Sequence, residues 1–172
     1  MLYYERIFRA FQRNKLRYLL AGGMAVNLHG IPRFTKDVDI LIDRSAENLT
    51  RLRAVIKSLG LKPRMPVTLD EFLDPVHWEA WGREKNLKAL SLYNPQDPYE
   101  GLDILWNVGL DYETAGKDPK TLKIGHLKIA MVSVKNLIKM KKRAGRQQDL
   151  ADITALKKLP REILKRKGRS SR

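Results

Sequence analysis

Residues 20–43, LAGGMAVNLHGIPRFTKDVDILID, contain the pattern that decides the fold. The apolar run 15–23, KLRYLLAGG, predicts a short buried strand that ends in a glycine turn. MAVNLHG, over 24–30, predicts a short helix closed by Gly30 and Pro32. DVDILID, over 37–43, predicts the next strand. The stretch therefore indicates strand, helix, strand.

Two aspartates stand at the head of that second strand. Side chains alternate between the two faces of a strand, so Asp37 and Asp39 share one face, roughly 7 Å apart along the strand. The apolar residues between and after them point to the other face and into the core. Like charges held together repel each other and are costly to desolvate, so these carboxylates need a positive partner.

The rest of the chain adds more strands and helices around this unit. Residues 1–15 predict an amphipathic helix, and 45–60 predict a helix with an N-cap at Ser45 and a stop at Gly60. Residues 61–86 predict a loop and one or two short helices. Strands are expected at 87–94 and 101–108, a hairpin at 122–133 turning near Gly125, and helices at 133–145 and 146–159. The pattern predicts an α/β or α+β domain with a mixed sheet and a C-terminal helical appendage.

Composition narrows the class of protein and its partners. The chain has 172 residues, 34 Lys+Arg against 19 Asp+Glu, and no cysteine. The absence of cysteine excludes disulfides and thiolate metal sites. No segment has the ~20 apolar residues needed to cross a bilayer, so we expect a cytoplasmic protein. A formal net charge of +15 favours polyanionic partners, although solvated surface lysines also account for such a balance.

A third carboxylate, Asp103, lies in GLDILW over 101–106. It is the one charged residue of a strongly apolar strand, whose other side chains alternate away from it. If this strand lies beside 38–42, Asp103 shares a face with Asp37 and Asp39. Three such carboxylates suit two divalent ions, Mg²⁺ or Mn²⁺, which favour displacement at phosphorus. Taken alone, the pair of Asp37 and Asp39 also fits a solvated turn or a helix cap. The glycine pair alone also fits an ordinary turn from strand to helix.

These residues resemble the nucleotidyltransferase superfamily with the DNA polymerase beta type of fold. The similarity lies in AGGMAV (21–26), KDVDIL (36–41) and GLDILW (101–106). The chain is more similar still to the small prokaryotic branch that includes AbiEii-like toxins, through HGIPRFTKDVD (29–39) and LIKMKKRAGRQQDLADI (137–153). The resemblance implies a nucleotidyltransferase-like mixed sheet flanked by helices. It also implies Mg²⁺-dependent transfer of a nucleotidyl group from a nucleoside triphosphate such as ATP, with release of pyrophosphate.

The resemblance also assigns roles to particular residues. The metal ligands and catalytic carboxylates would be Asp37, Asp39 and Asp103, with Asp103 helping to deprotonate the acceptor. Nucleotide and phosphate binding would fall to Gly22, Gly23, Arg33, Thr35, Lys141 and Arg146, supported by Asp149. On a continuous helix, Lys141, Gly145, Asp149 and Asp152 would share one face. Many relatives carry Ser where this chain has Met24, which leaves only a backbone N–H for phosphate.

Domain division and partners complete the expectations. We expect a catalytic core over 1–132, helices packed on it over 133–160 within the same domain, and a basic tail over 161–172. The acceptor hydroxyl is left open among RNA (for example a tRNA end), protein and small molecules. A toxin of a toxin–antitoxin pair, with an antitoxin partner, is one version of this function. The alternative is an inactive module of the same fold that binds nucleic acid or nucleotide.

Overall fold

The computed structural model describes residues 3–160, apart from the side chain of Pro98. The predicted tail over 161–172 lies outside the described residues. The helices are α1 (Tyr3–Arg13), α2 (Gly22–Leu28), α3 (Ala46–Leu59), α4 (Leu69–Phe72), α5 (Pro75–Glu84), α6 (Tyr112–Ala115), α7 (Val134–Ala144) and α8 (Gln147–Lys157). The strands are β1 (Tyr18–Leu20), β2 (Val38–Ile42), β3 (Lys62–Pro63), β4 (Ala89–Asn94), β5 (Asp97–Leu105), β6 (Lys120–Ile124) and β7 (Leu127–Met131).

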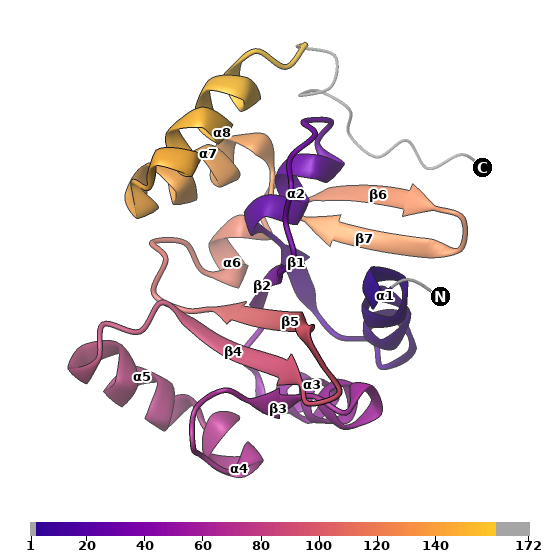
Figure 1. Ribbon diagram of the computed structural model, residues 1–172, viewed down its shortest axis with the longest axis vertical. Coiled ribbons are helices and arrows are strands. Elements are labelled where there is room, and N and C mark those ends of the chain that lie inside the picture. Colours follow the sequence, from indigo (N-terminus) through magenta and orange to yellow (C-terminus); the bar gives the residue numbers. More distant parts are fainter. Residues whose placement is uncertain (1–2, 161–172) are drawn as a thin grey trace.

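The strands form one mixed sheet in the order β3-β4-β5-β2-β1-β7-β6 (Figure 1). β2 pairs with β5, and β1 with β7, in parallel, whereas the other neighbours are antiparallel. This confirms the expected fold class, a mixed sheet flanked by helices. The strand over 37–43 lies at the centre of the sheet, beside the strand that carries Asp103.

One face of the sheet is covered by apolar packing. Ile40 of β2 is fully buried there, and so is its cross-strand partner Leu20 of β1. Tyr18, the first residue of β1, packs against Phe8 and Phe11 of α1, with ring centroids 6.3 and 4.6 Å away. The amphipathic stripe of α1 thus packs against β1, on the sheet face that carries no carboxylate.

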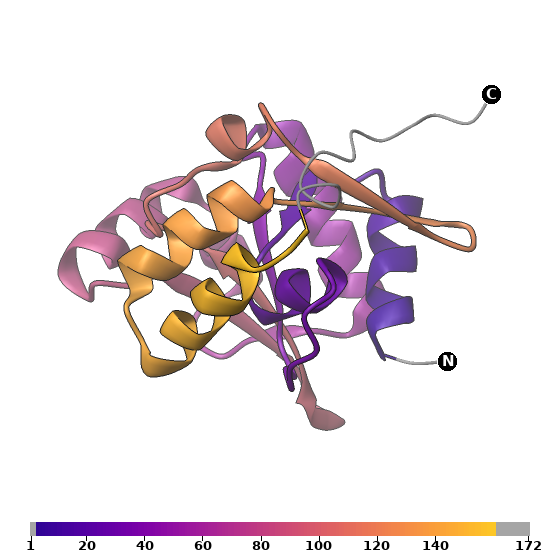
Figure 2. The ribbon, with the colours of Figure 1, turned by 90° about the horizontal axis from the view of Figure 1, so that it is seen from above.

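Local signals place the helix ends. The Ser45 side chain accepts a hydrogen bond from the Asn48 N–H at the start of α3, and Gly60 ends α3 with φ of 66°. At the other end of the chain, Gly145 adopts φ of 67° and separates α7 from α8. α7 and α8 lie side by side in both views (Figures 1 and 2). The expected N-cap and stop of α3 are confirmed.

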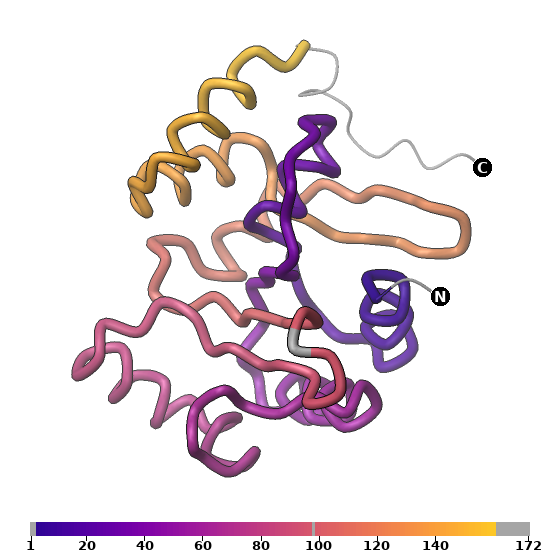
Figure 3. Tube along the Cα trace, viewed as in Figure 1, coloured from indigo at the N-terminus to yellow at the C-terminus, as the bar shows by residue number. Residues whose placement is uncertain are grey.

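Three details differ from the expectations. β5 begins at Asp97, so the turn before it is shorter than expected and Pro98 lies within the strand. The short strand β3 falls in a segment predicted as loop, because its pairing partner is the distant β4. Helix α6 was not predicted, being four residues long. The hairpin of β6 and β7 turns at Gly125 as expected and projects from the body (Figure 3).

No helix within residues 3–160 is both long enough and apolar enough to span a membrane.

Candidate active site

The site is built on the neighbouring strands β2 and β5. Their parallel register sets Asp39 directly beside Asp103. Because paired residues of adjacent strands point to the same face, both carboxylates lie on the face opposite Ile40 and Ile104. Both aspartates are half-buried, whereas Asp37, just before β2, is exposed. The strand that carries Asp103 thus lies beside 38–42, as the sequence analysis required for Asp103 to share a face with Asp39.

Ser91 joins this face from β4. The antiparallel register of β4 and β5 pairs Ser91 with Asp103. The Ser91 side chain hydrogen-bonds to Asp103, which lowers the pKa of that carboxyl, although burial of Asp103 raises it more. Sequence reasoning did not find Ser91, because only the register of β4 against β5 reveals which residue faces Asp103.

Because Gly22 has no side chain, the Asp39 carboxylate can lie directly beside it. A Cβ built on Gly22 would lie 1.8 Å from Oδ2 of Asp39, and Gly22 has φ of +59°. The backbone N–H of Gly23 donates a hydrogen bond to Asp39. The first turn of α2 therefore sits directly against the Asp39 carboxylate. Gly22 has a structural role here, independent of any phosphate.

The three carboxylates form one electrostatic unit. Burial, followed by the charges of Asp103 and Asp37, raises the pKa of Asp39 to about 7. The Gly23 N–H and the charge of Arg146 act in the opposite direction but do not outweigh them. The pKa of Asp103 is also raised, first by burial and then by the charge of Asp37. Negative charge is thus concentrated at this point and incompletely compensated by the protein's own cations.

The carboxylates do not form a closed ligand cluster. Within residues 3–160, no group of three His, Cys, Asp or Glu side chains has an arrangement that could hold a metal ion as it stands. The donor chemistry nevertheless fits a hard divalent cation, which takes carboxylate oxygens together with oxygens of a bound phosphate. The raised pKa of Asp39 points the same way, since a cation would relieve the repulsion that causes part of it.

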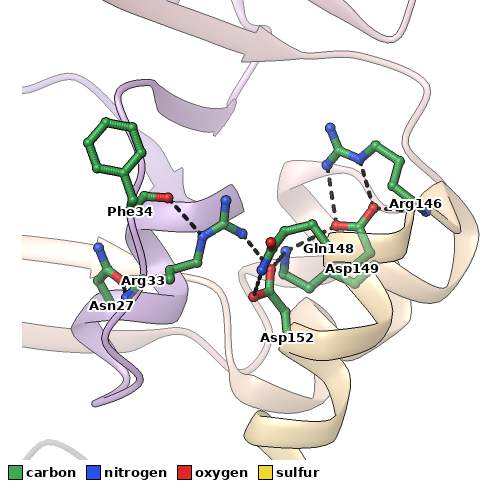
Figure 4. Close-up of polar contacts among 8 residues, drawn as sticks. Asn27, Arg33, Phe34, Arg146, Gln148, Asp149 and Asp152 are labelled. Atoms are coloured by element: carbon green, nitrogen blue, oxygen red, sulfur yellow. Dashed lines mark hydrogen bonds and ion pairs between the residues drawn. The ribbon is translucent and has the colours of Figure 1, made fainter.

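The loop before Asp37 is held from two sides. On one side, the Tyr4 hydroxyl of α1 donates to the backbone oxygens of Thr35, at 3.0 Å, and Lys36, at 3.3 Å. On the other, Arg33 Nη1 contacts Asp152 Oδ2 of α8 at 2.5 Å. Figure 4 shows the Arg33 side chain reaching from its loop toward Asp152. Tyr4 and Asp152 were not among the predicted site residues.

Arg33 and Thr35 both lie over the start of α2. A Cβ on Gly23 would stand 2.7 Å from Thr35 Oγ1 and 3.0 Å from Arg33 Cζ. The backbone N–H of Arg33 donates to the Asn27 side chain at 2.8 Å. The structure therefore brings Gly22, Gly23, Arg33 and Thr35 together beside Asp39.

The C-terminal block forms a buried network of charges (Figure 4). Lys141 Nζ lies 3.2 Å from Asp149 Oδ1 and 2.6 Å from Asp152 Oδ2, and the Lys141 side chain is 5% exposed. Arg146 Nε contacts Asp149 Oδ2 at 2.7 Å. Burial raises the pKa of Asp149, but hydrogen bonds from Arg146 and Lys141 outweigh it and hold the pKa below its usual value.

The expectation of one continuous helix face is wrong. Gly145 ends α7, and the chain then turns into α8. Lys141 on α7 therefore contacts Asp149 and Asp152 on the neighbouring helix α8. The network is consequently tertiary, and through Asp152 it reaches Arg33 in the loop before Asp37. Arg146 remains largely exposed, and its charge acts on Asp39.

Two cavities lie along the strands that carry the carboxylates. One, of about 470 Å³, is the Asp37 pocket and is lined by Arg33, Phe34, Thr35, Lys36, Asp37, Arg64 and Tyr99. The other, of about 580 Å³, is the strand-end pocket and includes Leu41 of β2 and Leu105 of β5. By strand alternation, Leu41 and Leu105 share the face of Asp39 and Asp103, two residues further along each strand. The Asp37 pocket therefore borders one carboxylate directly, whereas the strand-end pocket lies further along β2 and β5.

Comparison with protein families identifies this arrangement. The family described as nucleotidyl transferase AbiEii toxin, type IV TA system, matches residues 4–99. The chain belongs to the AbiEii nucleotidyltransferase toxin family. The matched region contains the glycine pair, Asp37 and Asp39, while Asp103 lies beyond it. A search of curated proteins finds no significant match.

Solved structures agree on the fold of this AbiEii-family protein. The antibiotic-resistance factor ANT(2'')-Ia superimposes with a TM-score of 0.58 at 14% identity, covering 94% of this chain and 85% of that chain. A protein from Thermotoga maritima, described as a nucleotidyltransferase, gives 0.53 at 14% identity, with 88% of each chain covered. At this identity the likeness establishes a nucleotidyltransferase-like fold, and the chemistry must come from the site itself.

Proposed function

We propose that this AbiEii-family protein transfers a nucleoside monophosphate from a nucleoside triphosphate to an acceptor hydroxyl, with Mg²⁺ or Mn²⁺ at Asp37, Asp39 and Asp103. The observation that carries the proposal is the pairing of Asp39 with Asp103 on one sheet face, under the first turn of α2. Two bound ions would neutralise the phosphate oxygens and the departing pyrophosphate.

The reaction balances with the groups present. The acceptor oxygen forms a bond to the α-phosphorus, and the bond from that phosphorus to the oxygen bridging to the β-phosphate breaks. Pyrophosphate leaves, and the proton of the hydroxyl passes to a carboxylate. Asp103 suits this role, because burial raises its pKa and thereby makes its carboxylate a better base.

The phosphates are assigned to the cations and N–H groups around the carboxylates. Gly22 and Gly23 offer backbone at the start of α2, and Arg33 and Thr35 lie against them. Arg146 is exposed and acts on Asp39, so it can pair with a phosphate without desolvation of a buried group. Lys141 stays a predicted phosphate ligand; its ammonium donates to two carboxylates, which a phosphate would have to replace.

The biological setting follows from the family. The family description names a type IV toxin–antitoxin system, which supports a toxin role with an antitoxin counterpart. We place the reaction in the cytoplasm, where nucleoside triphosphates are available, and retain 1–132 as the catalytic core with 133–160 packed on it. Met24 is buried in α2, so its side chain contributes to packing.

Label transfer tests the proposal. The protein is incubated with each α-labelled nucleoside triphosphate and Mg²⁺, together with total RNA, with protein or with small hydroxyl compounds. The expected result is a labelled acceptor, lost on addition of a chelator. Absence of transfer to every acceptor, combined with absence of triphosphate binding by calorimetry, would contradict the proposal and favour the inactive binding module.

A further inference from the structure

Two aromatic rings stand exposed at the Asp37 pocket. Among the described residues, the large apolar side chains that remain exposed are Phe34, Val76, Tyr99, Ile124 and Leu150. Phe34 is 82% exposed and Tyr99 is 73% exposed, and both line the Asp37 pocket. No other aromatic ring of residues 3–160 packs against either of them. Two such rings at one pocket offer apolar surface that a ligand can cover.

Phe34 is carried by the loop that precedes β2. The Tyr4 hydroxyl holds the backbone of this loop by donating to the oxygens of Thr35, at 3.0 Å, and Lys36, at 3.3 Å. The backbone oxygen of Phe34 itself accepts a hydrogen bond from Arg33 Nε at 3.3 Å. Figure 4 shows the Phe34 ring pointing away from α8. The backbone at Phe34 is therefore held by its neighbours, while the ring stays free to contact a ligand.

Tyr99 projects from an irregularity in β5. The register of β4 against β5 shifts just before Gly101 and leaves residues 98–100 outside the regular ladder. Irregularities of this kind bend a strand and re-aim its side chains, and they are common next to active sites. Lys36 Nζ lies 5.1 Å from the centroid of the Tyr99 ring. The irregularity thus brings Tyr99 to the loop that carries Phe34.

The Asp37 pocket joins these rings to the carboxylates and to the start of α2. A Cβ on Gly101 would stand 3.5 Å from Oδ1 of Asp37, so this carboxylate lies against β5 next to the irregularity. Arg33 and Thr35 line the pocket and also lie against Gly23 at the start of α2. One pocket therefore borders a proposed metal ligand, two predicted phosphate ligands and the two rings.

The charges around the rings narrow the class of ligand. The basic residues Arg33, Lys36 and Arg64 line the pocket, together with the carboxylate of Asp37. These cations disfavour a positively charged ligand, while the negative face of an aromatic ring disfavours an anion placed upon it. A neutral planar ring stacks well on such faces, and a phosphate joined to it would pair with the cations. The pocket therefore fits a nucleobase joined to phosphate.

We propose that the base of the nucleoside triphosphate stacks on Phe34 and Tyr99 in the Asp37 pocket, with its phosphates directed to the start of α2. This inference rests on the proposed function, because it assigns a place to the base of the nucleotide that is transferred. The cavity volume of about 470 Å³ lies in the range of small-molecule sites. Every base has a π face, so the rings should contribute to the binding of all four triphosphates.

The base of an acceptor nucleotide would offer the rings the same chemistry. We assign the rings to the triphosphate because Arg33 and Thr35 belong both to this pocket and to the surroundings of Gly23, where the phosphates are proposed to bind. A base in the pocket and its phosphates at the start of α2 then belong to one molecule. The Michaelis constants of the two substrates separate these sources.

The test removes each ring and compares ligands with and without a base. Phe34→Leu and Tyr99→Leu lose the ring, whereas Phe34→Tyr and Tyr99→Phe keep it and serve as matched controls. Calorimetry in Mg²⁺ measures the binding of ATP, CTP, GTP and UTP, and of inorganic tripolyphosphate, which has phosphates but no base. We expect roughly tenfold weaker triphosphate binding in each leucine variant, little change in the ring-retaining variants, and an unchanged affinity for tripolyphosphate throughout. Both positions are exposed, so thermal unfolding of the leucine variants should match that of the unmodified protein.

Each outcome decides the inference. Equal losses for the triphosphates and for tripolyphosphate would overturn it, because the rings would then act on the phosphates or on the fold. A raised KM for the acceptor alone would assign the rings to the acceptor base and overturn it as well. Ring-dependent triphosphate binding without label transfer would support the base site and contradict the proposed function. Label transfer with an unchanged triphosphate KM in both leucine variants would contradict the base site and support the proposed function.

Discussion

Oδ2 of Asp39 occupies the position that a side chain on Gly22 would need, since a Cβ added to Gly22 would lie 1.8 Å from that carboxylate oxygen. The glycine pair and the aspartate pair, which are separated in the sequence, thus form one packed unit. The Gly23 N–H completes it by donating to the same carboxylate. Any side chain at position 22 displaces the group on which the proposed chemistry depends.

Gly22→Ala should therefore lose activity and stability together. Gly125→Ala is a matched control, because Gly125 has a similar φ of +57° but nothing within 4 Å of its Cβ position. The control isolates the cost of the left-handed backbone, about 1–2 kcal/mol. We expect Gly22→Ala to cost more than this in urea unfolding, because the clash adds to the strain. Equal costs would show that Asp39 moves aside freely.

Asp39→Asn should stabilise the metal-free fold at neutral and higher pH. The folded pKa of Asp39 is raised, so ionisation opposes folding: the cost is absent below the unfolded pKa and complete above the folded value of about 7. We expect a gain of about 2 kcal/mol at pH 8, a figure reduced for solvent screening of a half-buried group. Thermal unfolding at pH 8 and pH 4 measures it. A gain that persists unchanged at pH 4 would contradict this origin.

Lys141→Met should strongly destabilise the pair of α7 and α8. The substitution removes the cation between Asp149 and Asp152 and leaves two carboxylates buried at 1% and 3% exposure. Breaking a buried pair in this way costs about 3–5 kcal/mol. Lys142→Met is the control, since that neighbour is exposed and should change stability by less than ~0.5 kcal/mol. Chemical denaturation of both variants distinguishes them, and similar values would refute the structural role of Lys141.

Tyr4→Phe should slow nucleotidyl transfer while sparing the fold. The ring stays, but the hydroxyl that holds the backbone of Thr35 and Lys36 just before Asp37 is lost. A lost neutral hydrogen bond costs about 1 kcal/mol of stability. If the Tyr4 hydroxyl only stabilises the fold, the Mg²⁺ dependence of the rate stays unchanged in the variant. If it positions Asp37, the variant needs a higher Mg²⁺ concentration to reach its half-maximal rate. Tyr18→Phe, which loses a hydroxyl bonded to the backbone of Ala130 away from the loop before Asp37, serves as the control.

The sequence predicted what depends on local pattern. Alternation along 37–43 placed Asp39 on the face opposite the core, and apolar spacing with Ser45 and Gly60 placed α3. It even gave a correct condition for Asp103, because a lone charge in an apolar strand needs a partner. These features are fixed by a few neighbouring residues, so a single sequence is enough to predict them.

The residues that were missed act through long-range pairing. Ser91 faces Asp103 only through the register of β4 against β5, and Tyr4 reaches the loop before Asp37 from α1. Asp152 contacts Arg33 because Gly145 turns α8 back along α7. Such contacts join residues that are far apart in the sequence, so no local sequence pattern predicts them. The two helices predicted over 133–145 and 146–159 are confirmed, and it was the assumption of one shared helix face across Gly145 that was wrong.

The proposed function requires the paired carboxylates of β2 and β5 to act together in nucleotidyl transfer. The most direct measurement is the rate of label transfer from an α-labelled triphosphate by Asp39→Asn, Asp103→Asn and the exposed control Asp70→Asn, under saturating Mg²⁺. We predict that the first two each lose at least ~100-fold, by analogy with removal of one electrostatic group in other active sites, and that the control retains its rate. Transfer that survives in either Asp39→Asn or Asp103→Asn would contradict the claim.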